Sequence, residues 1–206
     1  MRNYRIIIIT VLIFIIIFII GHISNRQYSA QPIKETTIEK PQSSEIMAKQ
    51  AYSNSKHNFS ISVPKGWEID EGFFGTVVSL KNPKPDYEDE YPFNAGINIF
   101  TESSEGTDLQ TYEGSGDKLW RAVLPNTRIE DTIKDINGRQ VKITSELFTL
   151  REIFHVKVLQ WITIKDGQAY TLTAFTLEST WDQYKDIIES SLLSFRFNNE
   201  DGFKSD

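Results

Sequence analysis

Six consecutive residues, from Asp86 to Tyr91, hold four carboxylates and two tyrosines, which is the densest set of potentially reactive groups in the sequence. Carboxylate oxygens are the ligands that Ca²⁺ prefers, but the Asp-x-Asp-x-Asp-Gly spacing that folds a loop around calcium is absent. The tyrosines would equally suit a contact with another protein. We identify the six as candidate partner-contact residues, with a solvated loop and calcium binding as alternatives: Asp86, Tyr87, Glu88, Asp89, Glu90 and Tyr91.

The remaining reactive residues do not form a recognisable catalytic pattern. The three histidines, His22, His57 and His155, have no two members at metal-ligand spacing on one element. Gly114-Ser115-Gly116 fits neither a nucleophile elbow nor a dinucleotide fingerprint, because the required flanking glycines are missing. A kink in a helix is the simpler interpretation of these glycines. We therefore predict no catalytic residue, no cofactor and no metal site, and a protein that is not an enzyme.

Cysteine usage and charge exclude further classes. The chain has no cysteine, so a disulfide framework, a thiolate nucleophile and lipid attachment through an amino-terminal cysteine are all excluded. The formal net charge is -6, from 22 basic and 28 acidic residues. An acidic domain repels the phosphate backbone, so we predict no binding to nucleic acid.

The amino terminus joins two basic residues to an apolar run. Arg2 and Arg5 precede the stretch from Ile6 to Ile20, in which Thr10 is the only polar residue. With its flanks this segment reaches about 20 residues, enough to span a ~30 Å hydrocarbon core. Basic residues stay on the cytoplasmic side, so we predict a single-pass anchor over residues 1–23 that places the rest outside the cytoplasm. A cleaved signal peptide, giving a secreted protein, is the alternative.

The rest of the sequence divides by pattern. Residues 24–56 are polar and aperiodic and predict a flexible stalk, residues 57–198 predict one domain, and residues 199–206 predict a disordered tail. Within the domain, alternating apolar residues predict strands at 59–63, 76–81, 95–101, 129–136, 141–143, 154–164, 170–174 and 193–197. Helices are predicted over 107–124 and from Ser179 or Thr180 onward. This order predicts an α+β fold, with helices packed on a mostly antiparallel sheet.

The acidic stretch falls in a segment expected to lack regular structure. Residues 82–94 contain Pro83, Pro85 and Pro92, and proline cannot donate the backbone hydrogen bond that a strand ladder needs. We therefore predict a mobile surface loop without strand pairing.

Two motif groups stand near the ends of the domain. The first is Phe59-Ser-Ile-Ser-Val-Pro-Lys-Gly-Trp67; the second comprises Ala169-Tyr-Thr-Leu-Thr-Ala, Trp181-Asp-Gln-Tyr184 and Ser194-Phe-Arg-Phe197. Together they resemble the PsbP-like family, named for a photosystem II accessory protein. The resemblance implies an α+β sandwich and a non-enzymatic accessory or assembly role. An amino-terminal anchor in place of a plastid transit peptide argues against a photosystem role.

These observations favour a non-catalytic, membrane-anchored accessory or binding module outside the cytoplasm, with a protein partner at the cell envelope. Two alternatives stay open. A hydrolase-type enzyme would need two carboxylates converging in a cleft, one of them with a raised pKa. A purely structural envelope protein would self-associate without a specific partner.

Overall fold

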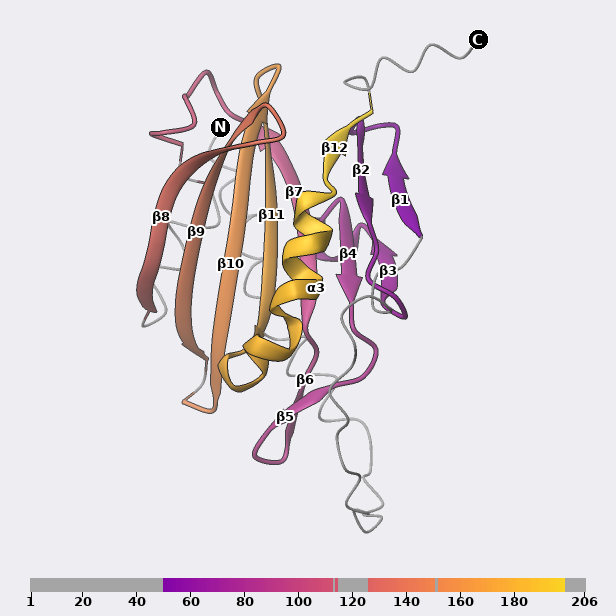
Figure 1. Ribbon diagram of the computed structural model, residues 1–206, viewed down its shortest axis with the longest axis vertical. Helices are drawn as coiled ribbons and strands as arrows, with labels where there is room; N and C mark the ends of the chain where they lie inside the picture. The colour runs from indigo at the N-terminus through magenta and orange to yellow at the C-terminus, as the bar shows by residue number, and fades with distance from the viewer. Residues whose placement is uncertain (1–49, 113, 115–125, 151, 199–206) are drawn as a thin grey trace.

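The computed structural model describes residues 50–112, 114, 126–150 and 152–198 of the 206-residue chain. Its centre is an antiparallel sheet of seven strands (Figure 1). In spatial order the strands are β3 (Glu68–Glu71), β4 (Val78–Lys81), β7 (Gly96–Ser103), β11 (Gln168–Leu177), β10 (Phe154–Lys165), β9 (Arg139–Leu150) and β8 (Asn126–Ile136). The last four are consecutive in the chain and form a meander.

Two tight turns explain why the meander forms where the sequence predicts it. Asn137-Gly138 joins β8 to β9, and Asp166-Gly167 joins β10 to β11. All four residues have positive φ, between 52° and 77°. Two-residue hairpin loops of this kind need positive φ at both central positions, which asparagine, aspartate and glycine adopt at low cost.

A second layer covers one face of the large sheet. It contains the helix α3 (Trp181–Leu193) and a small sheet made of β1 (Ala51–Asn54), β2 (Phe59–Ser62) and β12 (Arg196–Phe197), which lie beside each other in Figure 1. The short 3-10 turn η2 (Glu178–Thr180) leads into α3, and another, η1 (Phe73–Gly75), lies between β3 and β4. Buried side chains of the covered face, of α3 and of the small sheet together form the main hydrophobic core.

The predicted apolar stripe of the last helix is confirmed. Tyr184, Ile188 and Leu192 are buried at spacings of four residues, which places them on one side of α3, and Trp181 packs partly buried beside them. Across from them the sheet contributes buried aliphatic residues, among them Leu80, Ile97, Ile99 and Leu172. Burial of these side chains holds the helix on the sheet.

The structure corrects three sequence-based expectations. The predicted start of the domain at His57 is too late, because β1 lies within the segment predicted as stalk and pairs with β2. The segment predicted as an unpaired loop contains the hairpin of β5 (Asp86–Glu88) and β6 (Tyr91–Phe93). Helices in the plural were expected, but α3 is the one α-helix among the described residues. Residues 109–111 form a turn, and most of the predicted helix 107–124 lies outside the described part.

The predicted anchor, most of the predicted stalk and the predicted tail also lie outside the described residues. Within the described part of the chain, no helix has the length and apolar content to cross a bilayer.

Candidate functional site: the β5–β6 hairpin

The six candidate residues form a hairpin with a two-residue loop. Asp86 lies opposite Phe93, Tyr87 opposite Pro92, and Glu88 opposite Tyr91. Asp89 turns the chain with a φ of 51°, a conformation that aspartate tolerates better than most residues. Pro92 does not prevent pairing, because β5 and β6 form a separate two-stranded sheet, and no other described strand bonds to the outer side of either.

The hairpin divides the six residues between two environments, and Asp86, Glu88 and Tyr91 form the inward group. The outward group is Tyr87, Asp89 and Glu90, and the Tyr87 side chain is 56% exposed. Asp86 and Glu88 alternate with Tyr87 and are half-buried against the domain. The sequence could name the six residues, but only the strand conformation shows which of them a partner could reach.

Asp86 belongs to a chain of hydrogen bonds that ends on β5. The amide nitrogen of Asn82 donates to the Tyr184 hydroxyl over 2.9 Å, and that hydroxyl donates to Asp86 Oδ1 over 3.1 Å. Tyr184 lies on the buried side of α3, so the contact fixes the hairpin to the second layer. Tyr184 and Asp86 are far apart in the sequence, so no local pattern could have revealed the hydrogen bond between them.

The electrostatics of this contact follow from its burial. Desolvation raises the pKa of Asp86 above its ordinary value, although hydrogen bonds from Tyr184 and Thr180 act in the opposite direction. Burial, together with the negative charge of Asp86, raises the pKa of Tyr184 to about 12. Tyr184 therefore stays protonated at every physiological pH and serves as a permanent donor to Asp86.

Glu88 makes the second inward contact. Its Oε1 lies 3.4 Å from Nδ1 of His155, at the start of β10. The other oxygens of the two inward carboxylates, Asp86 Oδ2 and Glu88 Oε2, are buried and have no hydrogen-bond partner among the described residues. Each of these oxygens thus lacks the hydrogen bond that a buried polar atom usually has.

Aromatic packing completes the attachment of the hairpin. Phe93 is buried, with its ring centroid 5.6 Å from that of Phe154 and 6.2 Å from that of Phe175. Tyr91 meets Phe154 edge-on at 6.3 Å. The hairpin is therefore packed where β10 begins and β11 ends, whereas a surface loop without strand pairing was expected.

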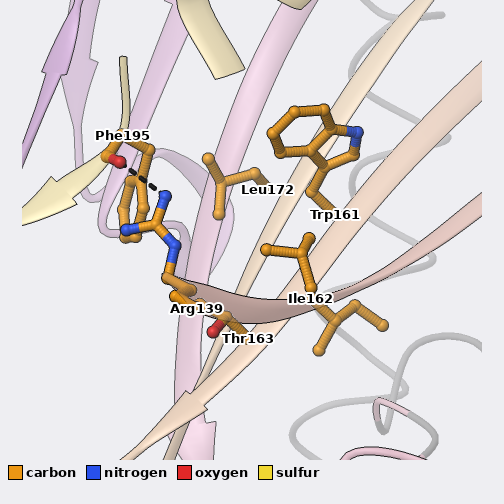
Figure 2. A pocket seen from close by; sticks show the side chains of 7 residues that line it. Arg139, Trp161, Ile162, Thr163, Leu172 and Phe195 are labelled. Atoms are coloured by element: carbon orange, nitrogen blue, oxygen red, sulfur yellow. Dashed lines mark hydrogen bonds between the residues drawn. The ribbon is translucent and has the colours of Figure 1, made fainter. Parts of the chain in front are cut away.

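The alternatives to a partner contact were calcium binding and hydrolysis by paired carboxylates, and we looked for a site for each among the described residues. Among them, no group of three or more His, Cys, Asp or Glu side chains is arranged to hold a metal ion. A hollow of about 10 Å³, room for about one water molecule, lies between β9, β10, β11 and Phe195 (Figure 2). The guanidinium of Arg139 donates to the Phe195 carbonyl oxygen at its side, and none of the seven lining residues carries a carboxyl group.

Comparison with known families agrees with this architecture. The family model for PsbP matches residues 48–197, most of the chain. The chain belongs to the PsbP family. The resemblance seen in the sequence motifs is thereby confirmed, and the match includes β1, which precedes the predicted start of the domain.

Two solved structures illustrate how far the likeness extends. Cyanobacterial PsbP (CyanoP) from Synechocystis sp. PCC 6803 is 16% identical, with a TM-score of 0.52 over 72% of this chain and 91% of that one. LpqN from Mycobacterium tuberculosis, described as involved in cell envelope biogenesis, is 11% identical, with a TM-score of 0.50 over 66% of this chain and 81% of that one. At these identities the likeness concerns the fold. A search of curated proteins found no match.

One feature of this PsbP-family domain lay beyond sequence reasoning. On the face of the large sheet opposite α3, register neighbours from all seven strands form a row of polar residues: Asp70, Ser79, Asn98, Thr173, Gln160, Thr144 and Asp131. Gln160 donates to the Thr173 hydroxyl over 3.2 Å and accepts from the Thr144 hydroxyl over 3.3 Å. Each strand carries one member, so only the register reveals the row.

Proposed function

We propose that this chain is a non-catalytic accessory module of the cell envelope that binds a protein partner through the outward side of the β5–β6 hairpin. Membership of the PsbP family supports an accessory role, and the envelope role in the description of LpqN is consistent with the location. The observation that carries the proposal is the division of the hairpin: its inward side chains attach it to the domain, while Tyr87, Asp89 and Glu90 face solvent on a packed support.

The exposed side chains of Tyr87, Asp89 and Glu90 define the chemistry of the partner in this proposal. A large aromatic ring next to two carboxylates is a combination that contacts a basic surface with an apolar recess for the ring. Because the hairpin is packed in place, little conformational entropy is lost when a partner binds it. The charges guide association, and the tyrosine supplies the buried anchor.

Photocrosslinking in intact cells tests the proposal. A benzophenone side chain replaces Tyr87 in one variant and Asp166 in the control. Asp166 is exposed in the β10–β11 turn, whereas Glu88 of the hairpin contacts His155 at the start of β10, so the two positions lie at opposite ends of that strand. We expect a discrete product of defined mass from position 87 and not from position 166. Equal products from both positions would refute the hairpin as the contact.

The proposed location rests on the charge bias of Arg2 and Arg5 and the apolar run from Ile6 to Ile20. In this proposal the first 23 residues anchor the chain with its amino terminus in the cytoplasm and its domain outside. Protease added to intact spheroplasts should degrade the domain and leave a short membrane fragment. Full protection of the domain would contradict export, and a mature amino terminus after residue 23 would show a cleaved signal instead.

A hydrolase-type enzyme is the second candidate, and the raised pKa of Asp86 is the observation that favours it. The two functions differ in what Asp86 does. In the binding module Asp86→Asn leaves partner capture unchanged, because the side chain faces inward. In an enzyme the same change would abolish turnover of a substrate. A purely structural envelope protein is the third candidate and would give no partner-specific crosslink at Tyr87.

A further inference from the structure

The two edges of the large sheet differ in length and charge. One edge is β3, four residues long, of which Glu68, Asp70 and Glu71 are acidic. The other is β8, with 11 residues, and no described strand pairs with its outer side (Figure 1). Short edges with charges of one sign repel a second strand, whereas a long regular edge presents unpaired backbone donors and acceptors to one. By this criterion β3 is protected and β8 is open.

The regular part of β8 begins after a bulge. Register with β9 shifts between Arg128 and Glu130, so Ile129 is the extra residue and its side chain is 55% exposed. From Glu130 to Ile136 the pairing with β9 is continuous. Ile133, in the middle of this stretch, is 36% exposed. The outer side of this stretch therefore has the regularly paired backbone that strand addition requires.

The charges along this stretch are arranged symmetrically about Thr132. Glu130 lies two residues before it and Lys134 two residues after it, which places all three side chains on one face. Within one copy the Lys134 ammonium reaches the Glu130 carboxylate over 3.0 Å, and the two side chains are 55% and 33% exposed. An acid and a base equidistant from a central residue form a self-complementary pattern for antiparallel pairing.

We propose that β8 pairs antiparallel with β8 of a second copy of this chain, about a two-fold axis at Thr132. In this register Glu130 of each copy lies opposite Lys134 of the other, and Thr132 lies opposite its counterpart. The two ion pairs then form between copies, and the sheet runs without a break from one copy into the other.

Like charges exclude the neighbouring registers that are centred on a residue. When the two-fold axis passes through a residue, side chains from the same face of each sheet lie opposite each other. The α3 layers of the two copies then lie on the same side of the joint sheet. Centring on Asp131 places that residue opposite itself, and centring on Lys134 does the same for the lysine. Centring on Ile133 places Asp131 opposite Asp135 twice. Between Asp131 and Lys134, only the register centred on Thr132 avoids a repulsive pair.

Disulfide trapping tests the register directly, because the chain has no cysteine of its own. Residues directly opposite each other in antiparallel strands have Cα atoms about 4.5–5.5 Å apart, within the range a disulfide spans. In full-length protein in detergent micelles, Thr132→Cys should oxidise to a covalent dimer. Asp135→Cys, about 20 Å from its counterpart in this register, and Asp70→Cys, on the other edge, should each give at least ~10-fold less dimer.

Charge exchange supplies an independent test of the same contact. Lys134→Glu places glutamates opposite each other and should weaken the dimer at least ~10-fold in sedimentation equilibrium at low salt. The double variant Glu130→Lys, Lys134→Glu restores opposite charges in every pair and should return to within ~3-fold of the parent. The swap also keeps the intramolecular pair, so a change in folding does not imitate this result.

Three outcomes would overturn the proposal: a parent that stays monomeric up to about millimolar concentration, equal crosslinking of all three cysteine variants, or a dimer indifferent to both charge changes. A dimer that is indifferent to both charge changes would show that the copies associate elsewhere, for example through the anchor. Because β8 and the β5–β6 hairpin lie apart (Figure 1), these variants should not alter crosslinking at Tyr87. Failure of the dimer is therefore distinguishable from failure of the proposed partner contact.

Discussion

The ring of Phe175 on β11 lies directly over Gly96, its register partner on β7. A Cβ atom built on Gly96 would lie 2.6 Å from Cζ of Phe175 and 3.1 Å from the carbonyl oxygen of Leu80. The glycine is thus required by close packing. Phe175 also meets Phe93 of the hairpin edge-on at 6.2 Å, so this contact lies beneath the candidate site.

Replacing Gly96 with alanine should therefore destabilise the domain. The new methyl group must displace the Phe175 ring or the β4 backbone, and overpacking of this kind costs about 1–3 kcal/mol. Urea denaturation of the parent, Gly96→Ala, Phe175→Leu and the double variant measures the effect as a cycle. The alanine should cost clearly less when Phe175 is leucine. An equal cost in both backgrounds would mean that the ring does not cause the strain.

The helix contact predicts a contrast between two positions on α3. Ile188 is fully buried, so Ile188→Ala should lower the free energy of unfolding by about 2–5 kcal/mol. Leu193, at the end of the same helix, is 49% exposed, so Leu193→Ala should cost less than about 1 kcal/mol. Both substitutions place an alanine in the same helix, and the gain in helix propensity from replacing isoleucine acts against the larger loss expected at Ile188. Similar losses at the two positions would contradict the packing of α3 described above.

Asp86→Asn should change the pH dependence of stability in a defined direction. Burial raises the folded-state pKa of Asp86, so the folded state favours the protonated carboxyl, and stability is lost as the pH rises from the unfolded pKa through the folded one. The asparagine cannot ionise and should be at least as stable as the parent at pH 7. Its advantage should shrink toward pH 3.5. If urea denaturation at pH 7 gave the parent a higher free energy of unfolding than the variant, the ionised carboxylate would be shown to stabilise the hairpin.

The sequence predicted the meander and the last helix because their signals are local. Asn137-Gly138 and Asp166-Gly167 favour hairpins through their own backbone preferences, and the stripe from Trp181 to Leu192 follows helical spacing. The anchor, the export of the domain and the tail lie outside the described residues and stay predictions.

The candidate site was predicted only as a set of residues. Three prolines and four carboxylates favoured a loop, yet Phe93 and Tyr91 pack on Phe154, and Tyr184 binds Asp86 from 98 positions away. Such long-range contacts override local propensity and have no counterpart in a short sequence pattern. The strand β1 was missed for a similar reason, since its four residues contribute one buried side chain, Tyr52.

The outward side of the hairpin should be dispensable for folding. Tyr87, Asp89 and Glu90 are exposed, so Tyr87→Ser, Asp89→Asn and Glu90→Gln together should change the free energy of unfolding by less than about 0.5 kcal/mol per site. Thermal or urea unfolding of the triple variant measures this. A larger loss would mean that these side chains support the fold, and would remove the reason to assign them to a partner.

The most direct test of the binding-module account is the affinity of this triple variant for the protein captured at position 87. With both proteins purified, calorimetry at two salt concentrations compares the parent, the triple variant and the inward-facing control Glu88→Gln. We predict a dissociation constant at least ~10-fold higher for the triple variant, a weaker salt dependence, and a control within about 2-fold of the parent. An unchanged affinity in the triple variant would contradict the account.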